Sequence, residues 1–441
     1  MSTYVSRPAA GPLAGELRAP GDKSLSHRAL MIAALAEGHS ELSGLNGGAD
    51  VEATGRMLSQ LGATCEVTDH KALVKGCGRE GLNESDDVLD AGNSGTTMRL
   101  GLGLCAGLQG ASVLTGDASL RRRPMLRVVE PLRSMGARID GRDRGERAPL
   151  FVRGGPLQGG ALTTSVASAQ VKSSLLLAGL KAAGTTSVTE PSLSRDHTER
   201  MLGAAGVRVS RSGLTVSVEG GDVPLPVEWN MPGDVSSAVY LVAAASMVPS
   251  SRLSLKGVGL NPTRVGALQA LREMGAHIET EPTGEEAGEP VGTIRIRASR
   301  LQGMTIEPSS VPGLIDEIPI LAVAATQATG ETVITGAAEL RVKESDRIDS
   351  VVAGITALGG NAHALADGLI VTGPTRLAGG IVESFGDHRV ALSFAVAGLV
   401  ASDEVTIEGW ECVATSFPEF SASLAQVGAA ATGKRYDGDG S

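Results

Sequence analysis

Aromatic side chains are scarce in this sequence. Trp, Tyr and Phe together supply 2% of its 441 residues, whereas hydrophobic residues of all kinds supply 42% and glycine occurs 59 times. The core must therefore be built from Ala, Leu, Val and Ile, and helices with such small side chains should pack closely. A charged fraction of 20% is typical of globular proteins. The length predicts two domains.

Cysteine is also scarce, and its spacing argues against disulfides and zinc. No Cys-x-x-Cys pair occurs among Cys65, Cys77, Cys105 and Cys412. We therefore expect reduced, buried thiols in a cytoplasmic protein.

Long apolar runs and an excess of positive charge are both absent. Runs such as Leu175–Leu180 and Leu241–Val248 suit core helices and are too short to span a membrane. The N-terminal segment lacks the apolar stretch of a secretory signal. The net charge of −10 argues against general nucleic-acid binding, which needs a basic surface. A local basic pocket is still compatible with it.

One helical unit recurs six times along the chain. Each copy begins with a short polar or Gly-containing segment before an Ala/Leu-rich helix, then has a β-like stretch and a second helix that ends at a Gly. A Gly just past a helix C-terminus is the usual left-handed stop. The unit predicts an α/β fold of helix–strand–helix–strand modules, three in each of two domains. The six starts are Gly21, Gly92, Ser168, Gly233, Asp316 and Gly386, and the six stops are Gly62, Gly136, Gly206, Gly275, Gly359 and Gly428.

Two segments are predicted to lie outside this pattern. The acidic insertion Glu281–Glu289 suggests a solvated loop, and the tail Gly433–Ser441 suggests a disordered terminus.

The first three unit starts carry groups suited to anions. After Gly21, Lys23, Ser24 and Arg28 lie at a helix N-terminus, where backbone N–H groups and the helix dipole favour negative charge. A helix cap with solvated charges fits the same residues. The second start has Asn93 and Gly95, and its Gly101–Ala106 dinucleotide-like pattern is rejected because it lies inside a helix. Start three, Ser168–Lys172, adds hydroxyl, amide and ammonium donors.

Other segments carry arginine, histidine and carboxylates. Arg121–Arg123 precede Pro124, which is predicted to be the first residue of a helix, and could bind a phosphate or form a solvated turn. Ser194–Glu199 resembles a helix start. If residues 341–347 are helical, Lys343 and Arg347 share a face, and Glu344 beside them is a candidate proton-transfer group; a mixed-charge exposed helix is the alternative.

The last two segments open apolar helices. His388 and Arg389 oppose the helix dipole, which suggests a bound anion. Asp316 could be an N-cap or a general base. Taken together, the starts predict a cleft for polyanions with Asp316 and Glu344 as acid–base candidates.

These segments, in this order, resemble the EPSP synthase family of enolpyruvyl transferases over about residues 15 to 420. Four motifs, at 21–24, 168–172, 195–199 and 261–264, resemble its glyphosate-tolerant subset. The resemblance implies a two-domain inside-out α/β barrel of six βαβαββ repeats with helix N-termini facing the interdomain cleft. It implies domains at 1–20 plus 234–441 and at 21–233. It also implies a cytoplasmic monomer that needs no metal or organic cofactor and has no nucleic-acid or membrane partner.

The implied reaction transfers the enolpyruvyl group of phosphoenolpyruvate to the 5-hydroxyl of shikimate 3-phosphate, by addition and elimination. By resemblance, the catalytic residues are Asp316, Glu344 and Lys23. The residues implied to bind shikimate 3-phosphate are Lys23, Ser24, Arg28, Ser168, Ala169, Gln170, Ser194, Arg195, Asp316 and Lys343. Those implied to bind phosphoenolpyruvate are Lys23, Asn93, Gly95, Arg123, Gln170, Lys343, Arg347 and Arg389.

The chain departs from the family pattern at three positions. Thr415 stands where many glyphosate-sensitive members have Lys, and Glu339 where some have Asn. Gly95 stands where some tolerant members have Ala, so the sequence leaves glyphosate inhibition open.

Three alternative functions are weighed against this one. The sister enzyme that uses UDP-N-acetylglucosamine typically has a Cys near the Arg-Pro turn, and none occurs between Thr115 and Arg123. A non-catalytic anion-binding repeat protein would not need Asp316 and Glu344. An RNA-end-processing enzyme would have a basic surface.

Overall fold

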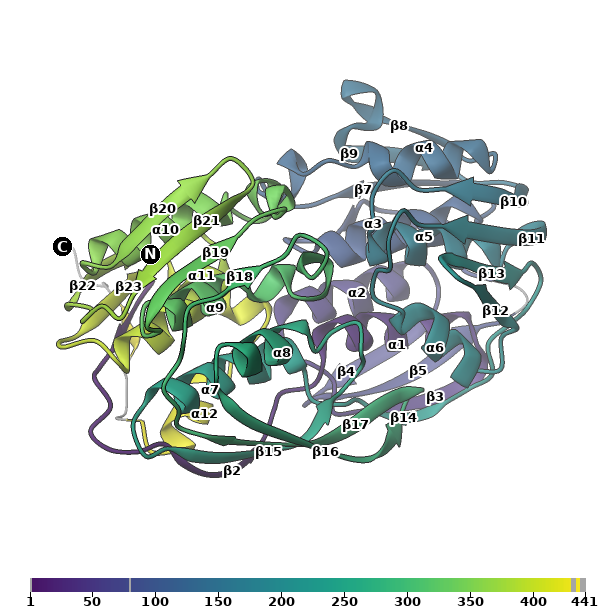
Figure 1. The fold of residues 1–441 in the computed structure, drawn as a ribbon. Helices are drawn as coiled ribbons and strands as arrows, with labels where there is room; N and C mark the ends of the chain where they lie inside the picture. Colours follow the sequence, from purple (N-terminus) through teal and green to yellow (C-terminus); the bar gives the residue numbers. More distant parts are fainter. Residues whose placement is uncertain (1, 79–80, 430–433, 437–441) are drawn as a thin grey trace, which may run out of the picture. The chain divides into compact units, whose positions relative to one another are not determined.

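The computed structural model describes residues 2–78, 81–429 and 434–436. Contacts divide the chain into two compact units, which are described separately. Unit 1 consists of Met1–Pro20, Gly233–Gly284 and Pro290–Ser441, and unit 2 of Gly21–Pro232 and Glu285–Glu289. Figure 1 gives the element labels used below.

Six helices follow the six predicted starts and are buried almost over their whole length. Their sequences are apolar on all sides, which is the pattern of a helix enclosed by other elements. Five begin with an Asp or Ser side chain that accepts a backbone N–H, whereas Glu317, before α9, makes no such bond. These inner helices are α1 (Lys23–Leu35), α3 (Gly95–Ala106), α5 (Ala169–Gly179), α7 (Val235–Met247), α9 (Ile318–Ala325) and α11 (His388–Gly398).

Each inner helix is followed along the chain by a second, more amphipathic helix. All six predicted stop glycines lie just past these helices with φ between 77° and 110°, where a side chain would be disfavoured. The second helices are α2 (Ala49–Gln60), α4 (Leu126–Ser134), α6 (His197–Ala204), α8 (Gly266–Glu273), α10 (Arg347–Ala357) and α12 (Phe420–Gln426).

The described strands form six four-stranded sheets of one common topology. In unit 2 the spatial orders are β14 (Glu228–Asn230), β3 (Glu37–Ser43), β5 (Lys71–Cys77), β4 (Thr64–Thr68); β6 (Leu89–Asp90), β7 (Ala111–Thr115), β9 (Arg147–Arg153), β8 (Arg138–Arg142); and β10 (Leu157–Thr163), β11 (Ala182–Thr189), β13 (Thr215–Glu219), β12 (Val209–Ser212). In unit 1, whose β16–β17 tip at Glu285–Glu289 is assigned to unit 2, they are β16 (His277–Glu286), β17 (Glu289–Arg297), β15 (Arg252–Gly259), β2 (Ala14–Arg18); β18 (Thr305–Ile306), β19 (Gly330–Ile334), β21 (Gly368–Gly373), β20 (Asn361–Leu365); and β22 (Gly380–Glu383), β23 (Val405–Glu408), β1 (Ser2–Ser6), β24 (Lys434–Tyr436).

Every sheet joins one parallel pair to two further strands that pair antiparallel. β10 and β11, for example, are parallel and are connected through α5, because a parallel pair needs a crossover. β13 then pairs antiparallel with both β11 and β12. In unit 1, one sheet is completed by both chain ends, since β1 pairs with β23 and with β24.

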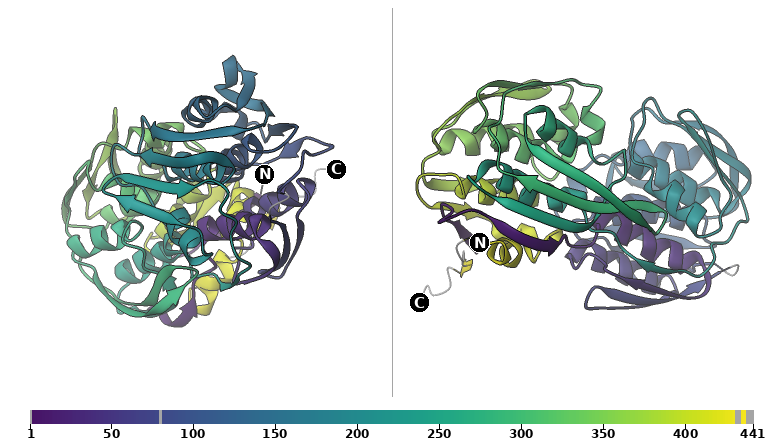
Figure 2. Two further views of the ribbon diagram at one scale, coloured as in Figure 1. Left: turned by 90° about the vertical axis from the view of Figure 1, so that its right-hand side faces the viewer. Right: turned by 60° about the horizontal axis from the view of Figure 1, so that its bottom comes forward.

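Within each unit the helices lie inside and the sheets outside, as the views in Figure 2 show. Strand burial alternates, as in β9, so that one face of a sheet packs on helices and the other meets water. The predicted α/β fold of six βαβαββ repeats is therefore confirmed. None of the helices in the described ranges is both long and apolar enough to cross a membrane.

Two sequence expectations were wrong. The acidic insertion is a β-hairpin: β16 and β17 meet at Ala287 and Gly288, both with positive φ, as in a tight hairpin turn. Its last residue, Glu289, is buried and accepts a 2.7 Å hydrogen bond from His197 Nδ1. In the tail, Lys434–Tyr436 form β24, while 433 and 437–441 lie outside the described residues.

Candidate active site

The N-terminus of α1, in unit 2, carries the predicted anion-binding residues Lys23 and Ser24. Asp22 caps the helix by accepting from Leu25 N at 2.9 Å. Lys23 Nζ lies 2.6 Å from Asp50 Oδ2 at the start of α2, with 18% of its side chain exposed. Burial lowers the pKa of His27 well below its usual value, and repulsion from Lys23 and Arg28 lowers it further. Two cations, Lys23 and Arg28, therefore act on the helix start, and the carboxylates of Asp22 and Asp50 oppose them.

Arg28 lies one turn further along α1 and is almost fully buried. Its guanidinium donates to Thr198 Oγ1 at 2.7 Å, Ser173 Oγ at 2.9 Å and Ser24 O at 2.9 Å. Burial lowers the pKa of Arg28 to about 10, against the attraction of Glu199. In the described part of the chain these hydrogen-bond partners are neutral, so the charge is held in place without direct neutralisation.

The starts of α3 and α5 are joined by side chains. Arg99 Nη1 donates to Gln170 Oε1 at 2.6 Å, and Gln170 Nε2 donates to Thr96 Oγ1 at 3.0 Å. Gly95 opens α3, where an added Cβ would lie 2.8 Å from Arg123 Nη1. The absence of a side chain at Gly95 therefore lets two guanidinium groups approach the helix N-terminus.

The other predicted residues of unit 2 surround these two helix starts or the start of α6. Ser168 caps α5 by accepting from Val171 N, and Ala169 is the first residue of that helix. Asn93 donates to Asp117 Oδ2 at 2.6 Å, which ties the loop before α3 to the next strand connection. Ser194 is buried and Arg195 partly buried in the segment before α6. Ser194 is not the cap of that helix, which begins after Asp196.

Lys172, Glu190 and Glu199 form a buried ionic cluster in unit 2. Lys172 Nζ is 2.6 Å from Glu190 Oε2 and 2.8 Å from Glu199 Oε1, and all three side chains are at most 8% exposed. Burial raises the pKa of Glu199, and Lys172 opposes that rise. Thr198 and Ser173, which accept from Arg28, are the chain neighbours of Glu199 and Lys172. The cluster therefore holds in place the two residues that bind this guanidinium.

Replacing Lys172 by Met is expected to destabilise unit 2 by about 3–5 kcal/mol near pH 8, because two buried carboxylates lose their cation. Without Lys172 the folded-state pKa of Glu199 rises further above its usual value of 4.5. A raised folded-state pKa gives stability that is lost as pH rises. The difference in unfolding free energy between wild type and Lys172→Met should therefore increase from pH 5 to pH 8. Urea unfolding at both pH values measures it.

The matched control for this substitution is Arg208→Met. Arg208 pairs with Asp222 at 2.8 Å on the surface of unit 2, with 73% of its side chain exposed. A surface pair of this kind should contribute under about 1 kcal/mol. A Lys172→Met effect as small as the control, or one that shrinks with rising pH, would contradict the role assigned to the cluster.

In unit 1, Arg347 binds three carboxylates while being 1% exposed. Its Nε donates to Asp387 Oδ2 at 2.8 Å, its Nη2 to Glu344 Oε2 at 2.6 Å and its Nη1 to Asp316 Oδ1 at 3.2 Å. Burial alone would lower the pKa of Arg347, but Asp387 and Glu344 reverse that effect and hold it above its usual value. The guanidinium therefore positions Asp316 and Glu344 together.

Asp316 is surrounded by cations from three segments. Besides Arg347, Lys343 Nζ lies 3.4 Å from its Oδ1 and Arg389 Nη2 lies 3.8 Å from its Oδ2. Arg389 Nη1 also donates to the Asp316 carbonyl at 3.0 Å and to Glu317 Oε1 at 3.2 Å. Asp316 and Glu344 are 14% and 17% exposed at their side chains. Both carboxylates are thus held firmly but are accessible.

A second set of polar residues supports this cluster from the start of α7. Arg264, in the Asn-Pro-Thr-Arg motif, donates to Ser236 Oγ at 2.6 Å and to Asp234 Oδ1 at 3.2 Å. Ser236 in turn donates to Glu317. This set explains the motif at 261–264 as support for Glu317, which follows Asp316 in the chain and accepts from Arg389.

The structure corrects three local interpretations. Lys343 and Arg347 do not share a helical face, because a 3₁₀ turn, η5 (Ala338–Val342), ends before Lys343 and α10 begins at Arg347. Both side chains instead lie next to Asp316 Oδ1, so the anion that separates the two cations is a carboxylate of the chain itself. Asp316 lies in the turn η4 (Ile315–Glu317) and caps no helix. Pro124 is not the first residue of α4.

Each unit brings its own set of predicted residues together. Asp50, Arg99, Glu317 and Asp387 also belong to these sets and were not predicted as functional. Asp387 had a detectable signal, because it caps a helix whose first residues are His388 and Arg389. Thr415 donates to Cys412 O at 2.7 Å and lies 3.5 Å from His388 Nδ1.

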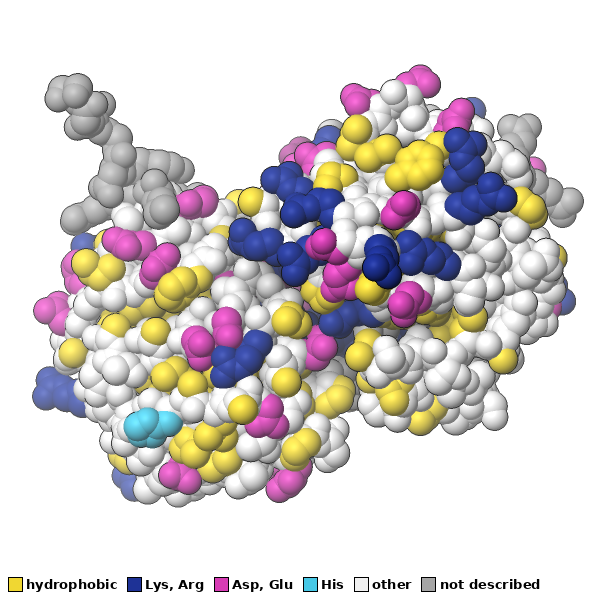
Figure 3. Space-filling model, turned by 90° about the horizontal axis from the view of Figure 1, so that it is seen from above, with side chains coloured by type: hydrophobic (Ala, Val, Ile, Leu, Met, Phe, Trp, Pro, Cys, Tyr) yellow, Lys and Arg dark blue, Asp and Glu magenta, His cyan; other side chains and the backbone are white. Residues whose placement is uncertain are grey.

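The two sets differ in charge. The set of unit 2 is dominated by Lys23, Arg28, Arg99 and Arg123, whereas that of unit 1 combines three cations with four carboxylates. The molecular face drawn in Figure 3 carries basic and acidic side chains interspersed. Over the described ranges, no group of three or more His, Cys, Asp or Glu could hold a metal ion.

A solved structure confirms the predicted inside-out α/β fold. EPSP synthase from Acinetobacter baumannii aligns with a TM-score of 0.88 at 41% identity, covering 99% of this chain and 100% of that one.

Sequence comparison agrees over almost the same length. A 3-phosphoshikimate 1-carboxyvinyltransferase from Desulfitobacterium hafniense (strain DSM 10664 / DCB-2) is 50% identical over 410 residues, 93% of this chain and 94% of the relative. One from Bacillus cereus (strain ATCC 10987 / NRS 248) is 48% identical over 427 residues, 97% of this chain and 100% of the relative. The family model of EPSP synthase (3-phosphoshikimate 1-carboxyvinyltransferase) matches residues 8–424. The chain therefore belongs to the EPSP synthase family.

Proposed function

We propose that this enzyme transfers the enolpyruvyl group of phosphoenolpyruvate to the 5-hydroxyl of shikimate 3-phosphate, releasing phosphate. The observation that carries the proposal is the placement of Asp316 and Glu344 on one buried guanidinium, Arg347. A binding protein for anions has no need of two accessible carboxylates among its cations. An enzyme that moves protons while binding anions needs both.

Asp316 and Glu344 take complementary roles in the proposed addition. The 5-hydroxyl oxygen of shikimate 3-phosphate bonds to C2 of phosphoenolpyruvate while Asp316 accepts the hydroxyl proton. Glu344 donates a proton to C3. Elimination then removes a proton from C3 and releases phosphate from C2, restoring the double bond. Lys343, Arg347 and Arg389 offset the negative charge of the carboxylate and phosphate groups.

Unit 2 supplies most of the proposed binding residues for the sugar phosphate, and Asp316 and Lys343 of unit 1 complete the set. Lys23, Ser24 and Arg28 come from the start of α1, Ser168, Ala169 and Gln170 from the start of α5, and Ser194 and Arg195 from the segment before α6. Asn93, Gly95 and Arg123 contribute to phosphoenolpyruvate binding, as does Gln170. Backbone N–H groups at these helix starts, with Lys23, Arg28 and Arg195 beside them, support this assignment.

We further propose that the two units are the domains predicted from the sequence, at 1–20 plus 234–441 and at 21–233. The division of contacts at Pro20 and Pro232 supports those limits. The proposed enzyme is a cytoplasmic monomer that binds glyphosate as an inhibitor and works without a metal ion.

The decisive assay is phosphate release from shikimate 3-phosphate plus phosphoenolpyruvate without added metal. Turnover that requires both substrates is the expected result. Release with UDP-N-acetylglucosamine as acceptor, and none with shikimate 3-phosphate, would assign the chain to the sister activity instead. Inactivity with both acceptors would contradict the enzymatic proposal.

Replacing Gly95 by Ala should raise KM for phosphoenolpyruvate and weaken glyphosate inhibition. The new methyl group would lie 2.8 Å from Arg123 Nη1 and 3.0 Å from Arg99 Nη1, so both guanidinium groups must move. Losing one well-placed charged hydrogen bond of about 1.5–3 kcal/mol corresponds to roughly tenfold or more. Steady-state kinetics with a glyphosate titration measures both effects.

Gly203→Ala is the control for this substitution. Gly203 lies in α6, and an added Cβ there would meet nothing within 4 Å. KM for shikimate 3-phosphate should change little in either variant. A Gly95→Ala enzyme with unchanged KM for phosphoenolpyruvate would show that Arg123 does not bind this substrate.

A further inference from the structure

One segment of unit 2 is strongly basic in an otherwise acidic chain. Residues 121–153 contain ten arginines and four acidic residues, a local excess of six positive charges, whereas the whole chain has a net charge of −10. Only Arg123 of these ten arginines belongs to the proposed active site. The function proposed above leaves the other nine unexplained.

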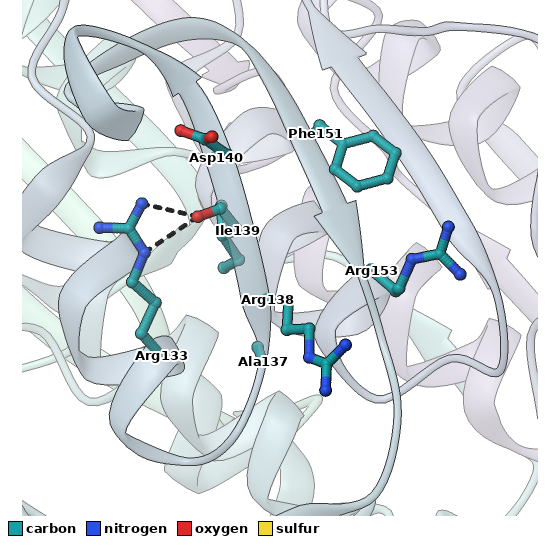
Figure 4. Close-up of a pocket in the computed structure, with 7 residues that line it drawn as sticks. All are labelled: Arg133, Ala137, Arg138, Ile139, Asp140, Phe151 and Arg153. Carbon is teal, nitrogen blue, oxygen red and sulfur yellow. Dashed lines mark hydrogen bonds between the residues drawn. The ribbon is translucent and has the colours of Figure 1, made fainter.

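Part of this segment lines an open surface depression of about 580 Å³ beside α4, β8 and β9. This volume lies within the range of roughly 300–1,000 Å³ that small-molecule pockets occupy. Figure 4 shows the lining residues, which are Arg133, Ala137, Arg138, Ile139, Asp140, Phe151 and Arg153.

Two arginines of the pocket are direct cross-strand neighbours on the same face of the sheet. Arg138 of β8 and Arg153 of β9 are directly paired in the strand register. Neither has an ion pair or side-chain hydrogen bond within the described ranges of the chain. Like charges directly opposite each other destabilise a pair of strands. An anion bound between the two guanidinium groups would remove that repulsion.

The pocket also exposes an aromatic ring in a protein with few of them. Phe151 is 41% exposed, and the guanidinium carbon of Arg153 lies 6.0 Å from its ring centre. The neighbouring wall is held in place by Arg133, whose Nε donates to Ile139 O at 2.9 Å and whose Nη2 donates to Arg144 O at 2.9 Å. A preformed wall with an accessible ring favours a ligand with a flat apolar face.

We propose that this pocket binds a small monoanion in which an aromatic ring carries a carboxylate. The ring stacks on Phe151, and the carboxylate lies between Arg138 and Arg153. Asp140 is paired with Phe151 in the register and adds one negative charge to the pocket. That charge disfavours doubly charged phosphates and so favours a carboxylate. The lining residues are separate from those assigned to the two substrates.

The test is calorimetric titration of the full-length protein with 3-phenylpropionate in the presence of saturating shikimate 3-phosphate. Saturable binding is expected. Propionate lacks the ring and 3-phenylpropanol lacks the charge, so each should bind at least about tenfold more weakly. Equal binding of either one would overturn the assignment of the group that it lacks.

Variants locate the binding. Arg138→Gln and Phe151→Ala should each weaken 3-phenylpropionate binding by about fivefold or more. Arg142→Gln, an exposed arginine of the same strand outside the lining set, should change it less than twofold, as expected for an unrelated surface substitution. Turnover in all three variants should match wild type, which verifies folding. Absence of binding to wild type, or equal binding by all variants, would overturn the proposal.

Discussion

Glu344→Ala is expected to lower kcat by about 10²–10⁴-fold, the usual contribution of a positioned general acid. The equilibrium affinity for shikimate 3-phosphate should change only slightly, because the proposed sugar-phosphate residues of unit 2 are untouched. Phosphate release measures the first quantity, and calorimetric titration with shikimate 3-phosphate measures the second.

Glu344→Gln separates proton transfer from packing. Glutamine retains a carbonyl oxygen that can accept from Arg347 Nη2, which now lies 2.6 Å from the carboxylate. It cannot donate a proton as an acid does, so turnover should remain low while the geometry is kept. Equal losses of substrate binding and turnover in both variants would exclude Glu344 as the proton donor. Recovered turnover in the glutamine variant would do the same.

Arg347→Met is expected to destabilise unit 1 by about 3–5 kcal/mol, because a buried ionic network loses its cation. Asp387 is fully buried and would lose its guanidinium partner, while Lys343 and Arg389 lie farther from Asp316 than Arg347 does. Trp229 belongs to unit 2 and Trp410 to unit 1. Urea unfolding of a Trp229→Phe protein, followed by fluorescence of Trp410, therefore reports on the unit that carries Arg347.

Arg347→Lys is the matched comparison. An ammonium group retains the charge but cannot bind three carboxylates through the planar fork of a guanidinium. Its stability should therefore lie between those of wild type and Arg347→Met, with turnover still strongly reduced. A methionine variant as stable as wild type would show that the carboxylates are accommodated without this cation.

The repeats were predictable because their signals are local. A cap such as Asp22 or Ser94 binds backbone groups within one turn of its own position. A stop such as Gly62 or Gly428 is required by a backbone angle at that one residue. Such features can be read from a few neighbouring residues, and their sixfold recurrence indicated the modules.

Interactions between distant segments were less predictable. The hairpin tip at Glu289 was taken for a solvated loop because its sequence is acidic, yet the tertiary structure buries that carboxylate against His197. The pairing of Lys23 with Asp50 likewise has no local signal beyond an acidic residue in the first turn of a helix. Burial and long-range partners override composition at such positions.

The sequence by itself determined the α/β class, the six modules and the family to which the chain belongs, because caps, glycine stops and ordered motifs are encoded by neighbouring residues. Only the tertiary structure decided how Asp316, Glu344 and Asp387 meet on Arg347, because these residues belong to three separate segments of unit 1. It also decided that Arg138 and Arg153 are cross-strand neighbours close to an exposed Phe151, because strand register pairs them. Such contacts depend on how the chain packs, and no short stretch of sequence specifies them.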